Sequence, residues 1–338
     1  MSGAAPSAAD GATRALTAEE LDRVVATAVR APSVHNTQPW RFDLDGDELH
    51  VRSDPTRRLP LGDPLGREML ISCGAAAVHA QLAVRGLGRR AHLTWSPTPD
   101  DVDHVATVTV SGPLEATAAE LRLLDAVPLR RTDRTAYAPT AVPAALVTGL
   151  ADAALQEGAH LTAEDRPDRV QLLQGLVARA DSAQRHDGAL QEETRAWVRD
   201  DRRPADGLPA DALPDHGHGR GSSLALRDFD PDDGAPADGQ EPPVAEHPLL
   251  LLLSTDTDTP RDWSRAGGAL ARVLLTATAA GLVVDPHTQV LEVPGQRWRL
   301  VAELGLTGSP QMLLRVGFPT GPGSPPSGRR PVSEVSSG

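Results

Sequence analysis

The stretch Ala31-Pro32-Ser33-Val34-His35-Asn36-Thr37-Gln38-Pro39-Trp40, residues 31–40, directly follows a predicted helix and precedes a predicted hairpin. Five of the six side chains from Ser33 to Gln38 are polar, so the segment can present many hydrogen-bond donors and acceptors. Trp40 adds a large apolar anchor with one N–H group. Such a segment suits a polar heterocycle with an apolar rim. On composition alone, a polar connector whose tryptophan packs in the core is the simpler interpretation.

The elements around this stretch follow from local patterns. Thr17-Ala18-Glu19-Glu20 has the capping-box spacing, and apolar residues then recur at helical spacing until Pro32 stops the helix. Two extended runs on either side of Asp45-Gly46 predict a hairpin over residues 41–51. The pattern that follows predicts a long buried helix over 66–88 and strands at 91–95 and 104–110.

The rest of the chain continues with helices and strands. The predicted helices are 117–126, 143–156, 169–183 and 262–281, and the predicted strands are a short one around Leu161, then 249–254 and 311–318. The long helices at 66–88 and 262–282 both begin a helix-then-strand unit, which amounts to a faint internal repeat. A duplicated chain that folds as a dimer within one polypeptide would explain this likeness. Chance similarity between two Ala-rich helices would explain it equally well.

Two segments lack the composition of a packed core. Residues 1–16 are small and polar, and we expect them to be disordered. Residues 204–248 are dense in Asp, Gly, Pro and His with few large apolar groups. A long segment of this kind inside a compact domain is usually a functional loop or disorder. We expect a partly ordered, lid-like insert.

Composition limits the class of protein. The net charge of −13 and the pI of about 5.3 argue against non-specific binding of nucleic acid and against docking on an anionic membrane. All 33 basic residues are Arg, so an Arg cluster has to be judged by its context. With one cysteine, Cys73, no disulfide framework or multi-cysteine metal site is possible within the chain. We expect a soluble cytoplasmic protein without a metal centre.

Residues 32–40 match every fixed position of the pattern Pro-Ser-x-x-Asn-x-Gln-Pro-Trp and so closely resemble a motif of the FMN-dependent nitroreductases. In that family the motif also follows the first core helix. The resemblance implies that Ser33 and Asn36 contact a flavin, with Pro32 beside them. His35 and Gln38 are weaker candidates, and Gln38 could serve only to brace the loop.

Two Arg-rich segments resemble the phosphate-binding parts of the same family. Arg130-Arg131-Thr132-Asp133-Arg134 is similar to its Arg-x-Ser-x-Arg/Lys segment, with Thr132 in place of Ser. Arg329-Arg330-Pro331 is similar to the start of its C-terminal segment. The resemblance implies that Arg130, Arg131, Thr132 and Arg134, with Arg329 or Arg330, hold the FMN phosphate through charge-assisted hydrogen bonds. Solvated Arg runs are the alternative for both segments.

Asp285-Pro286-His287-Thr288-Gln289 occupies the place of the family loop that approaches the flavin ring. The resemblance implies ring contacts from Thr288 or Gln289, whereas an ordinary turn before a strand would need no such role. The Glu-Gly pair of the family loop is absent, which weakens the case for hydride chemistry with NAD(P)H.

The order of these segments resembles that of the actinobacterial Acg-type nitroreductase-like proteins. The Pro-Ser motif lies in residues 17–120 and both phosphate segments lie in residues 121–335, so the resemblance implies an α+β fold with two half-domains forming an internal pseudo-dimer. FMN would lie between the halves of a monomer or homodimer. It would pass electrons from NAD(P)H to a nitroaromatic, a quinone or a similar acceptor, with no side chain acting as a catalytic acid. The alternative is a protein that sequesters or stores FMN without turnover.

Overall fold

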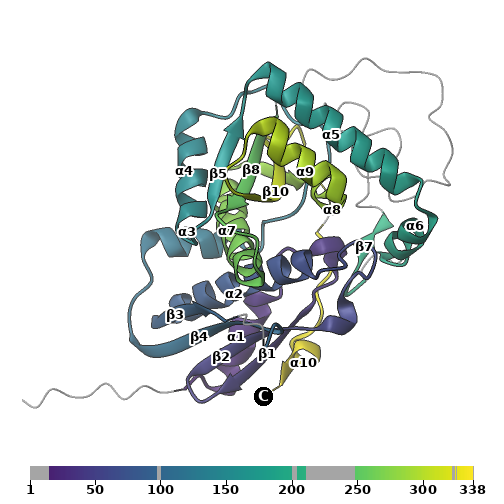
Figure 1. The fold of residues 1–338 in the computed structure, drawn as a ribbon. Coiled ribbons are helices and arrows are strands. Elements are labelled where there is room, and N and C mark those ends of the chain that lie inside the picture. The colour runs from purple at the N-terminus through teal and green to yellow at the C-terminus, as the bar shows by residue number, and fades with distance from the viewer. Residues whose placement is uncertain are drawn as a thin grey trace, which may run out of the picture.

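The computed structural model describes residues 15–96, 100–199, 204–210, 248–321, 324 and 326–337. It has a mixed α+β fold, as the sequence predicted, built around two mainly antiparallel sheets (Figure 1). Most of the predicted disordered start and residues 211–247 of the predicted lid-like insert lie outside the described residues.

The first sheet collects the N-terminal elements. Helix α1 (Ala18–Ala28) begins at Thr17 with both hydrogen bonds of the predicted capping box. Strands β1 (Trp40–Asp45) and β2 (Glu48–Ser53) form the predicted hairpin. Helix α2 (Arg67–Gly86), strand β3 (Arg89–Trp95) and strand β4 (His104–Pro113) complete this unit. The strand order is β11-β1-β2-β4-β3, where the C-terminal β11 (Ser336–Ser337) lies parallel to β1.

The second sheet has the order β5-β8-β10-β9 and is antiparallel throughout. Its strands are β5 (His160–Glu164), β8 (Leu249–Thr255), β9 (Val283–Pro286) and β10 (Ser309–Gly317). Helix α3 (Ala118–Ala126) links the two sheets along the chain. The helices that accompany the second sheet are α4 (Ala144–Leu155), α5 (Pro167–Arg185), α6 (Gly188–Arg195), α7 (Pro260–Ala279), α8 (Gln289–Glu292) and α9 (Pro294–Leu304). With β11 set aside, both sheets have the same strand order, and each has a long helix between its second and third strands.

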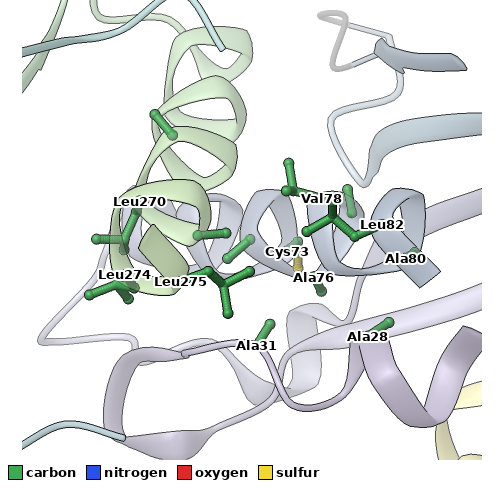
Figure 2. Packing of buried hydrophobic residues seen from close by; sticks show 14 of the residues in the cluster. Ala28, Ala31, Cys73, Ala76, Val78, Ala80, Leu82, Leu270, Leu274 and Leu275 are labelled. Carbon is green, nitrogen blue, oxygen red and sulfur yellow. The ribbon is translucent and has the colours of Figure 1, made fainter. Parts of the chain in front are cut away.

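Those two long helices, α2 and α7, cross at the centre of the molecule (Figures 1 and 2). Their backbones approach at two glycines. A Cβ on Gly74 would lie 2.0 Å from the carbonyl oxygen of Ser264, and a Cβ on Gly267 would lie 2.0 Å from that of Ile71. Each helix therefore presents a glycine to a carbonyl three residues before the partner's glycine, so the contact is reciprocal.

One apolar core fills the space around this crossing. Figure 2 shows Leu270, Leu274 and Leu275 of α7 beside Cys73 and Ala76 of α2. The second sheet is buried on both faces, because Leu251 and Leu253 face this core while Leu250 and Leu252 face a smaller one under α5, α8 and α9. Burial on both faces explains the unbroken leucine run of β8.

Several helices and one strand of the structure were not predicted from the sequence. Helices α6, α8 and α9 were not predicted, and α9 leaves Trp298 76% exposed. The two-residue C-terminal strand β11 of the first sheet was also not predicted. No described helix is long and apolar enough to cross a lipid bilayer.

The crossing predicts a matched pair of glycine substitutions. Gly74→Ala pushes a Cβ into the backbone of α7, and we expect it to lower the free energy of unfolding by about 3 kcal/mol. Gly149→Ala lies in α4, where nothing is within 4 Å of the new Cβ. We expect the second change to be neutral or to stabilise by about 0.5–1 kcal/mol. Urea unfolding of both variants measures the difference, and equal effects would contradict a tight crossing.

Candidate functional site

Two adjoining hollows form one groove between the elements of the two sheets. They share the wall residues Pro32, Ser33, His35, Thr132 and Arg134. The first, here called the apolar hollow, encloses about 790 Å³ with its open mouth included, and the second, the basic hollow, about 810 Å³. The groove takes walls from both sides of the molecule, so it exists only because the two sheets are packed together.

The loop after α1 forms the floor shared by the hollows. His35, Asn36 and Gln38 have positive φ angles of 45°, 54° and 49°, which non-glycine residues rarely adopt. Two hydroxyls hold this backbone: Ser33 Oγ accepts from Gln38 N at 3.1 Å, and Ser72 Oγ accepts from Val34 N at 3.2 Å. A strained loop persists only where the surroundings fix it, and such strain clusters at binding sites.

The predicted contacts Asn36 and Gln38 are engaged by other parts of the chain. Asn36 Nδ2 donates to the carbonyl oxygens of Gly207 at 2.9 Å and Gly328 at 3.2 Å. Gln38 Nε2 donates to Ala205 O at 2.7 Å, and Gln38 Oε1 accepts from Arg330 N at 2.9 Å. Both amides therefore fasten the segments 204–210 and 326–330 to the loop.

The basic hollow contains two half-buried arginines whose guanidinium groups have no acidic partner among the described residues. Within the described part of the chain, neither Arg130 nor Arg329 forms an ion pair, and the Nε atom of each is buried without a hydrogen bond. Arg329 donates only to the amide oxygen of Asn36 and to backbone carbonyls. Burial lowers the pKa of Arg130 to about 10. Burial and the charges of Arg130 and Arg30 lower that of Arg329 to about 9. An anion at this place would relieve both effects.

The apolar hollow is lined by the segment after β9 together with apolar side chains from several elements. Its further walls include Val34, Ile71, Leu270, Met312, Pro286, Thr288 and Gln289. The Arg-rich segment runs beside β9, because Thr132 bridges to Val284 and Asp133 N donates to Val284 O at 3.2 Å. This pairing brings the two predicted segments to the same groove.

A buried charge cluster lies at one wall of the apolar hollow. Asp285 Oδ2 is 3.2 Å from His287 Nε2 and 3.9 Å from Arg315 Nη2, and Asp285 Oδ1 is 3.8 Å from Arg134 Nε. Burial raises the pKa of Asp285, but His287 and the two arginines outweigh it, so the pKa lies below its ordinary value. Asp285 is therefore an ionised counter-charge at this wall. Arg134, which was predicted to contact a phosphate, is directed toward this carboxylate.

Comparison with known proteins identifies relatives along nearly the whole chain. The Mycobacterium tuberculosis protein named "Putative NAD(P)H nitroreductase Rv3131" is 37% identical over 94% of this chain and 91% of its own length. The protein of the same organism named "Putative NAD(P)H nitroreductase acg" is 30% identical over 95% of this chain and 96% of its own length. The chain belongs to the nitroreductase family. The predicted resemblance to the Acg-type nitroreductases is thereby confirmed.

Two other comparisons add less. No protein-family model matches the sequence. Among solved structures, a Bacteroides fragilis nitroreductase with bound FMN is similar at a TM-score of 0.37 and 16% identity, covering 62% of this chain and 94% of that one. The assignment to the nitroreductase family therefore rests on the sequence relatives.

Most candidate residues of the four nitroreductase-like segments meet at the groove. Asn36, Arg130, Arg131 and Arg329 line the basic hollow, Thr288 and Gln289 line the apolar hollow, and the five shared wall residues include Pro32, Ser33, His35, Thr132 and Arg134. Gln38 and Arg330 line neither hollow. Sequence reasoning did not single out Glu68, Ser72, Asp285 or His287 as wall residues. Glu68 and Ser72 lie near the start of the long buried helix α2, and their polar side chains on a buried helix were the available signal.

The environment of His79, near the two arginines of the basic hollow, predicts that the stability of the fold depends on pH. Burial and the charge of Arg130, with a smaller effect of Arg329, lower the pKa of His79 from 6.5 to about 3. His79 is thus neutral in the folded chain. Its contribution to stability is complete above pH 6.5 and is lost as the pH falls from 6.5 toward 3, by about 1.4 kcal/mol per pH unit.

Urea unfolding at pH 7.5 and pH 5.5 tests this, with His79→Gln as the comparison because glutamine does not titrate. The native sequence should lose about 1.4 kcal/mol more than the variant over this interval. Equal losses would mean that His79 is charged in the folded chain.

Proposed function

We propose that this nitroreductase holds FMN along the groove, with the phosphate in the basic hollow and the ring system in the apolar hollow. The observation that carries the proposal is the pair Arg130 and Arg329, which have no acidic partner among the described residues and lie beside an apolar hollow. A phosphate dianion would supply the missing counter-charge. A flat heterocycle with polar edges would match the adjoining hollow.

Each end of the groove has side chains suited to this ligand. Arg130 and Arg329 would donate charge-assisted hydrogen bonds to phosphate oxygens, and the Thr132 hydroxyl and the exposed Arg131 lie on the same wall. Pro32, Ser33 and His35 would lie beside the middle of the ligand, since they line both hollows. Thr288 and Gln289 would contact polar edges of the ring. Gln38 and Arg330 would brace the loop, and Asn36 would hold the tail that carries Arg329.

The relatives named NAD(P)H nitroreductases favour an oxidoreductase activity for this chain. Bound FMN would accept a hydride from NAD(P)H and pass two electrons to a nitroaromatic, a quinone or a similar acceptor. The chain itself would position the ligands, neutralise the phosphate and provide hydrogen bonds to the ring. The ionised Asp285, with His287 and Arg134, would fix the electrostatic field at the ring end.

We also infer that residues 17–120 and 121–335 form an internal pseudo-dimer. The common strand order of the two sheets and the reciprocal contacts of Gly74 and Gly267 support this inference. The groove draws on both halves, so a single chain would supply every wall that it needs. A monomer would then be sufficient, and a homodimer would not be required to complete the site.

A comparison of two flavins tests the phosphate position. Arg130→Ala and Arg329→Ala should each weaken FMN binding by roughly tenfold to a hundredfold, since hydrogen bonds to charged groups contribute about 1.5–3 kcal/mol. Riboflavin lacks the phosphate, so its affinity should change little. Flavin fluorescence titration gives both dissociation constants.

Arg166→Ala is the matched control for these variants. Its guanidinium is 65% exposed and pairs with Asp168 on the surface, so FMN binding should be unchanged. Equal losses for FMN and riboflavin would contradict a phosphate in the basic hollow. A purified protein that takes up no FMN would overturn the proposed cofactor.

Turnover is tested on the yellow protein under anaerobic conditions. NADH or NADPH should bleach the flavin absorbance, and menadione or a nitroaromatic should restore it in stoichiometric amount. Stopped-flow absorbance near the flavin band follows both half-reactions. Yellow protein that neither nicotinamide cofactor bleaches would indicate the alternative function, a protein that sequesters FMN.

A further inference from the structure

A third hollow, here called the side chamber, adjoins the apolar hollow and shares Val34, His35 and Glu68 with it. It is much narrower than either hollow of the groove and has room for about one polar group the size of a water molecule. Its outer walls come from α5 and α6, which lie in the long connection between β5 and β8. The equivalent strands β1 and β2 are joined only by Gly46-Asp47. The side chamber therefore has no counterpart in the first half of the chain.

The insertion is fastened across the groove from the opposite side. Glu193 of α6 accepts hydrogen bonds from the backbone N–H groups of Leu61 at 3.0 Å and Gly62 at 2.8 Å. Asp181 and Gln184 of α5 face the chamber together with Glu292 of α8. Because both halves of the chain hold α6 and α5 in place, the chamber is a fixed part of the site.

The polar groups of the chamber wall are mainly hydrogen-bond acceptors. It contains the carboxylates of Glu68, Asp181 and Glu292, and no arginine is among its described wall residues. Arg67 and Arg185 bind Glu68 and Asp181 from outside the wall, at 2.8 Å and 2.5 Å. Glu292 accepts from Gln184 Nε2 at 2.6 Å and from Thr288 Oγ1 at 2.5 Å. These donors are already engaged, whereas carboxylate oxygens can accept several bonds each.

An orphaned acceptor gives independent evidence for a ligand. Gln191 is 9% exposed and lines the chamber, and its Oε1 atom has no hydrogen-bond partner in the described structure. Its Nε2 atom donates to Gln184 O at 3.1 Å, which fixes the amide. Buried acceptors of this kind are normally satisfied, so this oxygen is suited to a donor group of a ligand. The negative charge of Glu292 also acts on a nearby carboxyl group. Together with burial, it raises the pKa of Asp63.

We propose that the side chamber selects the electron acceptor by binding a small ammonium group, or another group rich in N–H donors, while the reducible ring of the acceptor lies against the flavin ring at the open mouth of the apolar hollow. The ammonium would donate to Gln191 Oε1 and to the carboxylates of Asp181 and Glu292. A carboxylate-bearing acceptor would meet like charge and unpaired acceptors. This inference rests on the proposed function, because it names the acceptor class of the same site.

Three acceptors of similar size test the proposal. With NAD(P)H as donor, kcat/KM should fall in the order 4-nitrobenzylamine, 4-nitrobenzyl alcohol, 4-nitrobenzoate. The amine should exceed the alcohol by about tenfold, the effect of one charge-assisted hydrogen bond. Equal kcat/KM values or the reverse order, measured on protein that turns over, would contradict ammonium binding in the side chamber. The proposed oxidoreductase function would not be affected.

Binding without turnover provides the second readout. Benzylamine should raise the Tm of the purified protein more than benzyl alcohol at equal concentration, and should perturb the flavin absorbance of the yellow protein. The Tm measurement does not depend on the flavin. Protein that binds benzylamine but does not turn over would contradict the proposed oxidoreductase function. The side chamber would then be an ammonium site but not part of an acceptor pocket.

Matched variants locate the effect. Gln191→Leu and Asp181→Asn should each reduce the amine-to-alcohol ratio severalfold, and Gln191→Glu should raise it. Glu303→Gln removes an exposed carboxylate from α9 and should leave the ratio unchanged. If the ratio changes as much in Glu303→Gln as in Asp181→Asn, the preference reflects the net charge of the protein and the proposal is wrong.

Discussion

The backbone contact between α2 and α7 is the constraint on which the rest of the structure depends. Gly74 and Gly267 allow the two helices to touch at carbonyl groups, and any side chain at either position would separate them. The helices carry Ile71 and Leu270, which both line the apolar hollow. A wider crossing would therefore enlarge the hollow and move the two halves of the groove apart.

A second constraint acts where the chain closes on itself. The loop at 33–38 has three strained non-glycine residues, and the side chains of Asn36 and Gln38 bind backbone groups of residues 205, 207, 328 and 330. Strand β11 then pairs with β1. The same contacts that hold the strained loop thus bring Arg329 beside Arg130. Two half-buried cations at one place are unfavourable in the free chain, and this cost is what makes the basic hollow suited to an anion.

The charges of the groove and of its side chamber change from one end to the other. The basic hollow has cations without a described acidic partner, the apolar hollow has the buried Asp285 cluster at its wall, and the side chamber has acceptors in excess. The walls of the side chamber that face away from the loop come from the insertion α5–α6. The part of the site common to the family motifs and the part peculiar to this insertion are therefore adjacent but distinct.

The sequence by itself determined the local elements and revealed the four segments that resemble the family. The capping box at Thr17, the hairpin and the long helices depend on nearby residues, so their patterns were sufficient. It also identified Ser33, Arg130, Thr288 and Arg329 as members of one site through the family resemblance. Only the tertiary structure decided the partners: Asp285 for Arg134, backbone carbonyls for Asn36 and Arg330 for Gln38. Those partners lie up to 292 residues away, and the energy of a buried polar contact depends on packing that no local pattern encodes.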